Sequence, residues 1–249
     1  MNGGRAVVVG VVVAVVVGAA TDARAFQCTR AGDLGPSLFW PKRVVTLQRS
    51  GEGQEVKASD IERVMQTAAQ TWSDIDCSDV VEQVGLPTDD RVVGFDWAAG
   101  TGSPANHNIV LFRNDDPADP LDTWTHDLGA IAITTVTFES NEGRLLDADV
   151  ELNDANFAFT ACDACDIHFD LENTLTHELG HVLGLDHSTD GEATMFPSAP
   201  EADTSKRSLG DDDIAAICTV YPADDATAGN CYPESPRAKP PRRPVGRNR

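Results

Sequence analysis

The sequence His177-Glu178-Leu179-Gly180-His181-Val182-Leu183-Gly184-Leu185-Asp186-His187 follows the pattern H-E-x-x-H-x-x-G-x-x-H, and the rest of the chain is best understood from it. On a helix, residues four apart lie one turn apart on the same face, so His177 and His181 can direct two imidazoles at one metal ion. Glu178 does not point in the same direction as His177, which suits a base acting on metal-bound water better than a third ligand. The pattern therefore predicts a helix that presents metal ligands and a base to one site.

Two further positions complete a site with three histidines. Asp170 is the predicted N-cap of the helix, and Gly184 can take a positive φ without a Cβ penalty, so the chain can turn there. His187 would then return as the third nitrogen ligand. Three neutral histidines leave the charge of a divalent ion uncompensated and its fourth position open to water, as expected of a catalytic zinc site. Two histidines four apart are often ordinary surface or core residues, but the complete pattern favours zinc.

The residues around this pattern resemble those of the metzincin metalloproteases, and specifically the matrixin (matrix metalloproteinase-like) branch. Ser188 directly follows the third histidine, as is usual in that branch. The segment Ala193-Thr194-Met195-Phe196-Pro197 is similar to the matrixin Met-turn. This resemblance implies that Met195 lies under the zinc ligands as an apolar floor and is not itself a ligand. Residues 208–222 resemble the last helix of the family.

The resemblance implies an α+β zincin-like catalytic domain: a twisted, mostly parallel five-stranded sheet with an antiparallel edge strand, three helices, and an active-site cleft across the domain. It implies a zinc-dependent endopeptidase, with one catalytic zinc ion held by His177, His181 and His187. Glu178 would activate the zinc-bound water and then return the proton to the leaving amine. We expect protein or peptide substrates, a monomeric enzyme, and a pocket shaped by residues after Pro197 for the side chain that follows the cut.

Residues 129–138, rich in β-branched side chains, form the clearest predicted strand. In matrixins the corresponding strand borders the active-site cleft, where a substrate peptide pairs with it antiparallel through main-chain hydrogen bonds. By that resemblance, Ile131 and Ala132 would line the cleft. Matrixins commonly have a histidine for a second, structural zinc where this chain has Ile133, and the matching histidine is also replaced within 147–154. The two replacements argue against a structural zinc ion.

Two acidic segments offer oxygen ligands of the kind that Ca²⁺ prefers. The first is the loop 114–127, rich in Asp and Pro, for which a charged surface loop is the default interpretation. The second is Asp147-Ala148-Asp149-Val150-Glu151, whose carboxylates alternate onto one face of a strand. Calcium is therefore an open second cofactor, without assigned ligands.

The region before the zinc pattern has the signals of a sheet and one helix. Residues 44–47, 92–95 and 109–112 are predicted strands because of their β-branched and aromatic content. Ser59 and Asp60 offer an N-cap for an amphipathic helix. Its apolar residues recur at helical spacing: Ile61, Val64, Met65, Ala68, Trp72 and Ile75.

The first 25 residues have the organisation of a secretory signal peptide. Arg5 precedes the apolar run 6–20, and Ala23-Arg24-Ala25 supplies an A-x-A cleavage site. Because the run is too short for a transmembrane helix, we expect a secreted, extracellular protein without a membrane span.

If cleavage follows Ala25, Phe26 becomes the N-terminal residue. In matrixins, the ammonium group of an N-terminal aromatic residue can pair with an aspartate of the last helix. By that resemblance, the partner here would be Asp211, Asp212 or Asp213.

Export to an oxidising compartment favours disulfides for the six cysteines. The C-x-x-C segment at 162–165 suits a local disulfide or two long-range ones. Six cysteines allow 15 pairings. Of these we predict Cys28 with Cys77 and Cys218 with Cys231, which would fasten the ends of the domain.

The sequence divides into a signal peptide (1–25), a catalytic domain (26–222) and a Pro- and Arg-rich tail (223–249) that is predicted to be disordered. The formal net charge of −21 argues against nucleic-acid binding, which requires a basic face. Two other functions fit the zinc pattern: a catalytically silent metzincin domain used for binding, and a non-proteolytic zinc hydrolase. The presence of Glu178 disfavours the first, and the Met-turn with the cleft strand disfavours the second.

Overall fold

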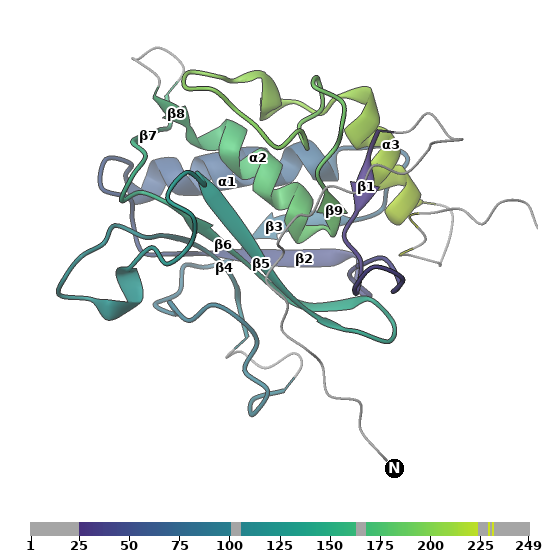
Figure 1. The fold of residues 1–249 in the computed structure, drawn as a ribbon, viewed down its shortest axis with the longest axis horizontal. Coiled ribbons are helices and arrows are strands. Elements are labelled where there is room, and N and C mark those ends of the chain that lie inside the picture. Colours follow the sequence, from purple (N-terminus) through teal and green to yellow (C-terminus); the bar gives the residue numbers. More distant parts are fainter. Residues whose placement is uncertain (1–24, 101–105, 163–167, 224–228, 230, 232–249) are drawn as a thin grey trace, which may run out of the picture.

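The computed structural model describes residues 25–100, 106–162, 168–223, 229 and 231. All but the last residue of the predicted signal peptide, and most of the predicted tail, lie outside this part of the chain. Figure 1 shows a twisted sheet with two long helices side by side over one of its faces. The hydrophobic core fills the space between the sheet and these helices. Within the described residues, no helix has the length and apolar character needed to cross a bilayer.

Among the described residues, the main sheet has five strands in the order β3-β2-β4-β6-β5. Their bounds are Val44–Ser50 (β2), Val81–Val84 (β3), Asn108–Phe112 (β4), Ala132–Glu139 (β5) and Arg144–Leu152 (β6). The strands from β3 to β6 pair in parallel, and β5 alone pairs antiparallel, with β6. The predicted sheet, mostly parallel with an antiparallel edge strand, is confirmed.

The described residues also form three α-helices: α1 (Ala58–Ser73), α2 (Leu171–Val182) and α3 (Asp211–Val220). Helices α1 and α2 pack against each other, and the buried indole Nε1 of Trp72 donates a hydrogen bond of 2.8 Å to the carbonyl oxygen of Thr176. With the five-stranded sheet, these three helices confirm the predicted α+β fold.

Helix α1 buries the residues that recur at the predicted spacing, but it begins earlier than predicted. It starts at Ala58, and the carbonyl of Lys57 already accepts the amides of Asp60 and Ile61 at 2.9 and 3.0 Å. The predicted N-cap at Ser59 and Asp60 is therefore wrong. Within the described part of the chain, no side chain caps the N-terminus of this helix. Its start is set by backbone hydrogen bonds and by burial of the apolar face. The buried side chains are Ile61, Val64, Met65, Ala68, Ala69 and Trp72.

A short two-stranded sheet lies at each end of α2. Before α2, β7 (Phe159–Thr160) pairs in parallel with β8 (Phe169–Asp170). Beyond its C-terminus, β9 (Leu185–Asp186) pairs antiparallel with β1 (Gln27–Cys28). The start of the described chain is therefore anchored next to the end of the metal-ligand pattern.

The strand predicted at 92–95 is wrong, because these residues form a loop over the sheet. Gly94 has a φ of 96°, and its amide donates to a carboxylate oxygen of Asp149 at 2.6 Å. The other carboxylate oxygen of Asp149 accepts the amide of Ile109 at 3.0 Å. A buried side chain thus satisfies backbone donors that strand pairing would otherwise have used.

The acidic face of β6 lies largely buried beneath loops. Burial raises the pKa of Asp147 to about 6 and that of Asp149 well above its usual range. Glu151 accepts a hydrogen bond of 2.7 Å from Arg113 and lies 3.0 Å from the imidazole of His126. Protein groups therefore already contact Asp149 and Glu151. Calcium binding at residues 114–127 or 147–151 stays a prediction.

The disulfides differ from the two pairs predicted from the sequence. Cys28 bonds to Cys231, and Cys77 bonds to Cys218. The predicted pairings of Cys28 with Cys77 and of Cys218 with Cys231 are therefore wrong. Cys162 is also disulfide-bonded, whereas residue 165 lies outside the described residues. Because Cys231 is buried, the folded domain includes a residue beyond the predicted boundary at 222.

Glu82 in β3 is a buried carboxyl with an unusual environment. It is 4% exposed, and neither carboxyl oxygen has a hydrogen-bond partner among the described residues. Burial raises the pKa of Glu82 well above its usual value of 4.5. The folded protein therefore holds this proton at a pH where the unfolded chain has lost it, and stability falls as the pH rises above 4.5 toward the raised pKa.

We expect Glu82→Gln to stabilise the protein at pH 8 by about 1–3 kcal/mol, because the neutral amide removes the cost of the raised carboxyl pKa, about 1.4 kcal/mol for each pKa unit. At pH 4, where both states of wild type carry the proton, the difference should vanish. Urea unfolding at the two pH values measures this, with the exposed Glu52→Gln as control. A less stable Glu82→Gln variant at pH 8 would show that the ionised carboxylate is needed.

Candidate active site

Helix α2 carries the first two histidines, and its start is fixed as predicted. The side chain of Asp170 caps it by accepting the amide of Asn173 at 2.8 Å. Arg207 holds this cap with hydrogen bonds of 2.8 and 2.6 Å to the two carboxylate oxygens. One turn of helix separates His177 from His181, and their ring centroids lie 4.9 Å apart.

The chain turns back immediately after α2 and returns the third histidine. Gly184 has a φ of 87°, and a Cβ at this position would lie 2.5 Å from the carbonyl oxygen of Leu38. The turn at a positive φ is as predicted, and the close carbonyl leaves room only for glycine. Each of His177, His181 and His187 offers a ligand nitrogen, and these atoms lie within 4.8 Å of one another. The structure therefore brings together the three histidines that the sequence singled out.

Hydrogen bonds orient two of the three rings. His177 Nδ1 lies 2.7 Å from the carbonyl oxygen of Thr194, and His181 Nδ1 lies 2.9 Å from that of Leu185. A carbonyl oxygen only accepts, so each Nδ1 donates its proton and each Nε2 keeps a lone pair. His181 Nε2 and His187 Nε2 are 3.2 Å apart. Such convergent lone pairs fit a shared cation.

The protonation state of the histidines also suits a metal. Burial is the largest cause that lowers the pKa of all three imidazoles, that of His187 to about 4. They are therefore neutral at neutral pH, the form in which histidine binds metal ions. The donor set, three neutral nitrogens, fits zinc.

The Met-turn packs against α2 behind the histidines. Met195 is 1% exposed, and a Cβ on Gly180 would lie 2.2 Å from its sulfur atom. The turn is held by the buried carboxylate of Asp213 in α3, which accepts the amides of Thr194, Met195 and Gly210 at 2.7, 3.0 and 2.9 Å. The sequence pointed to Met195 but not to this role of Asp213.

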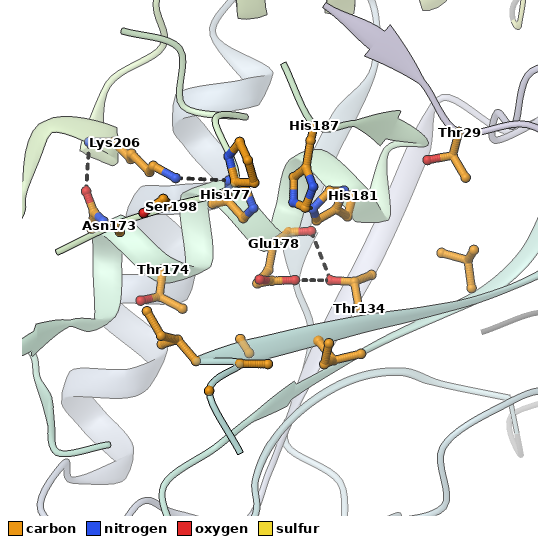
Figure 2. A pocket seen from close by; sticks show the side chains of 18 residues that line it. Thr29, Thr134, Asn173, Thr174, His177, Glu178, His181, His187, Ser198 and Lys206 are labelled. Atoms are coloured by element: carbon orange, nitrogen blue, oxygen red, sulfur yellow. Dashed lines mark hydrogen bonds between the residues drawn. The ribbon is translucent and has the colours of Figure 1, made fainter. Parts of the chain in front are cut away.

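Glu178 lies between the histidines and strand β5 (Figure 2). It is 6% exposed, and Thr134 donates a hydrogen bond of 2.6 Å to its Oε2 atom. Burial raises the pKa of Glu178, while the hydrogen bond from Thr134 and the nearby His187 and Lys206 lower it. Sequence analysis missed Thr134, although it lies two residues from Ala132 in the cleft strand, and alternation places the two on the same face.

The three histidines and Glu178 open into a hollow of about 350 Å³, here called the cleft. Its lining comprises Thr29, residues 129–134, Val136, Asn173, Thr174, His177, Glu178, His181, His187, residues 197–199 and Lys206. Ile131 and Ala132 are part of this lining, where the family resemblance placed them. Their contact with substrate stays a prediction.

Lys206 is a second residue of the cleft that sequence analysis missed. It belongs to a short 3₁₀ helix, η2 (Ser205–Arg207), and is only 6% exposed. Its ammonium donates to the carbonyl oxygen of Phe196 and lies 3.5 Å from His177 Nδ1. Burial lowers the pKa of Lys206. No local pattern separates this lysine from the surrounding polar loop.

The N-terminal end of the described chain reaches the last helix. The backbone nitrogen of Ala25 donates to Asp212 Oδ1 at 3.1 Å, and Ser188 donates to Asp212 Oδ2 at 2.6 Å. Asp212 is one of the three aspartates expected to meet a new N-terminus. Here it meets residue 25, whereas the expectation named Phe26, so a pair with the Phe26 ammonium stays a prediction.

Comparisons with known proteins agree with this geometry. Residues 105–222 match the family model of the matrixins. The chain is 27% identical over 164 residues to metalloendoproteinase 4-MMP of Arabidopsis thaliana, covering 66% of the chain and 40% of that protein. It is 51% identical over 53 residues to metalloendoproteinase 1 of Glycine max, covering 21% and 17% respectively. A third relative, neutrophil collagenase of Homo sapiens, is 42% identical over 69 residues, covering 22% and 15%.

The sheet with its antiparallel edge strand, the convergent histidines and the Met-turn packed against their helix define a metzincin. Within that class, the family match and the metalloendoproteinase relatives support a matrixin-like metzincin. The chain spans less than half the length of the relatives it matches.

Proposed function

We propose that this protein is a secreted zinc-dependent endopeptidase that hydrolyses internal peptide bonds of extended protein substrates. One observation carries the proposal: the buried carboxylate of Glu178 lies beside three convergent histidines in a cleft bordered by an edge strand. The names of the relatives, which are metalloendoproteinases and a collagenase, support the same activity.

His177, His181 and His187 would hold the zinc ion through Nε2. When bound, zinc supplies a Lewis acid that acidifies a water molecule and polarises the scissile carbonyl group. Glu178 takes the proton from the attacking water and then delivers it to the nitrogen of the leaving amine. The hydrogen bond from Thr134 holds Oε2 and would leave the other carboxylate oxygen, Oε1, to carry this proton.

Strand β5 would orient the substrate. It lies at the edge of the sheet, paired with β6 on one side only, so the backbone groups of its other edge can pair with an extended peptide. Residues 129–134 border the cleft on this side, and residues 197–199 border it as well. Ile131 and Ala132 would contact the substrate. The substrate side chain that follows the scissile bond would enter between α2 and residues 197–199.

The predicted signal peptide and the two long-range disulfides support a secreted, extracellular protein. The net charge of −21 supports a protein substrate over a nucleic acid. A monomer satisfies the mechanism, because every proposed catalytic group comes from one chain. Calcium is not required for any step.

Metal removal tests the proposed function. We expect 1,10-phenanthroline to abolish casein cleavage by the purified protein, because without the metal the cleft has no Lewis acid. Zinc added back in equimolar amount should restore cleavage. The non-chelating isomer 1,7-phenanthroline is the matched control. Cleavage that persists in protein shown by elemental analysis to be free of metal would overturn the proposal.

A further inference from the structure

The cleft contains a buried cation that the proposed mechanism does not use. The backbone amide of Lys206 donates to Asn173 Oδ1 at 2.7 Å, and its ammonium donates to the carbonyl oxygen of Phe196. Both ends of the residue are therefore held, and Figure 2 shows the side chain directed toward His177. A lysine is rarely 94% buried without a specific partner.

The hydrogen-bonding capacity of this ammonium is not filled by the protein. An ammonium has three donors and no acceptor. Its second neighbour, His177 Nδ1 at 3.5 Å, already donates to the carbonyl oxygen of Thr194 at 2.7 Å and cannot accept. In the part of the chain that the structure describes, no carboxylate forms an ion pair with Lys206. Donors of Lys206 are left for a group that enters the cleft.

The charge of the cleft is the opposite of the charge of the chain. The chain as a whole has a formal net charge of −21, yet the charged residues of the cleft lining, apart from the histidines, are Lys206 and Glu178. Glu178 accepts a hydrogen bond from Thr134, and in the proposed mechanism it takes the proton of the attacking water. With a divalent ion on the histidines, the cleft is net positive and favours an anionic group over an apolar one.

The position of Lys206 indicates which part of a substrate it would meet. Lys206 lies next to Nδ1 of His177, away from the Nε2 atom that would hold the metal. Lys206 lines the cleft together with Asn173 and residues 197–199. By the family resemblance, residues after Pro197 shape the pocket for the side chain following the cut, and we place Lys206 in that pocket.

We propose that Lys206 makes the enzyme prefer substrates with an acidic side chain on the residue that follows the scissile bond. The inference rests on the proposed endopeptidase function and names its substrate class. The ammonium binds the substrate carboxylate by a charge-assisted hydrogen bond. A leucine at the same position would leave these donors of Lys206 buried and unsatisfied.

Three peptides that differ only in the residue after the scissile bond test the proposal. With Glu, Gln and Leu at this position, we expect wild-type kcat/KM to favour Glu over Leu by about 10- to 100-fold, the range of a charged hydrogen bond. Gln has the shape of Glu without its charge and should fall between them. Lys206→Met should remove the preference, and Lys206→Arg should keep most of it. The exposed Lys42→Met is the matched control and should behave as wild type.

Peptide binding supplies a readout that does not need turnover. In zinc-loaded Glu178→Gln protein, calorimetry should show tighter binding of the Glu peptide than of the Leu peptide, and Lys206→Met added to this background should equalise them. A binding preference without hydrolysis in wild type would sustain the role of Lys206 and overturn the endopeptidase function. Efficient hydrolysis with no preference, or a preference unchanged in Lys206→Met, would overturn the role of Lys206 and leave the endopeptidase function intact.

Discussion

Glu178→Gln should abolish peptide hydrolysis while the protein still binds zinc with wild-type stoichiometry. The amide has the size of the carboxylate, and its oxygen can still accept the hydrogen bond from Thr134, so the fold should persist. An amide cannot take a proton from the attacking water, and loss of general acid–base catalysis costs about 10²- to 10⁴-fold in rate. Steady-state kinetics with a fluorogenic peptide, together with elemental analysis of bound zinc, measures both quantities.

The exposed Glu192→Gln, which lies between the third histidine and the Met-turn, is the control for this variant and should retain full activity. A Glu178→Gln enzyme within tenfold of wild type would show that another group serves as the base. Wild-type protein that is folded and zinc-loaded but cleaves nothing would favour the alternative of a metzincin domain used for binding.

The part of the site that lies within one short segment could be predicted from the sequence. The spacing of His177, His181 and His187 follows from helix geometry and from one turn, which the positive φ of Gly184 allows. These relations involve neighbours in sequence, so the pattern itself encodes them. The mostly parallel sheet with its antiparallel edge strand came from the family resemblance, because strand content alone does not determine topology.

The groups that complete the site come from distant parts of the chain, and no local signal marks them. Thr134 meets Glu178 across 44 positions of sequence, and Lys206 reaches His177 across 29. Each contact depends on how β5 and η2 pack against α2, which is a tertiary property.

The wrong predictions of a strand at 92–95 and of the disulfide pairs also concern contacts between distant parts of the chain. Residues 92–95 have the composition of a strand, but the amide of Gly94 bonds to the buried carboxylate of Asp149 and the segment forms a loop. The disulfides join residues 203 and 141 positions apart. The predicted pairs fastened each end of the domain by itself, whereas the observed disulfides join its N-terminal part to its C-terminal part.

Asp213→Ala should strongly destabilise the domain. Asp213 is fully buried and accepts the amides of Thr194, Met195 and Gly210. Its removal leaves three backbone donors without a partner, each costing about 1–3 kcal/mol. Because such costs do not add fully, we expect a loss of about 3–5 kcal/mol in the free energy of unfolding, measured in urea on the metal-free protein. Asp211→Ala, at the exposed first residue of α3, is the matched control and should change stability by less than about 0.5 kcal/mol.

Asp213→Ala should also weaken zinc binding. The carbonyl of Thr194 holds His177 Nδ1 at 2.7 Å, and the amide of the same residue bonds to Asp213 at 2.7 Å. A loosened Met-turn therefore frees the ring of a zinc ligand, and loss of such an outer partner weakens metal binding by about 10- to 100-fold. Asp213→Asn keeps one acceptor oxygen but turns an amide group toward backbone donors, so it should fall between wild type and Asp213→Ala in both measurements. Unchanged zinc affinity in a clearly destabilised Asp213→Ala protein would separate the Met-turn from the metal site, and His177 would then owe its orientation to α2 alone.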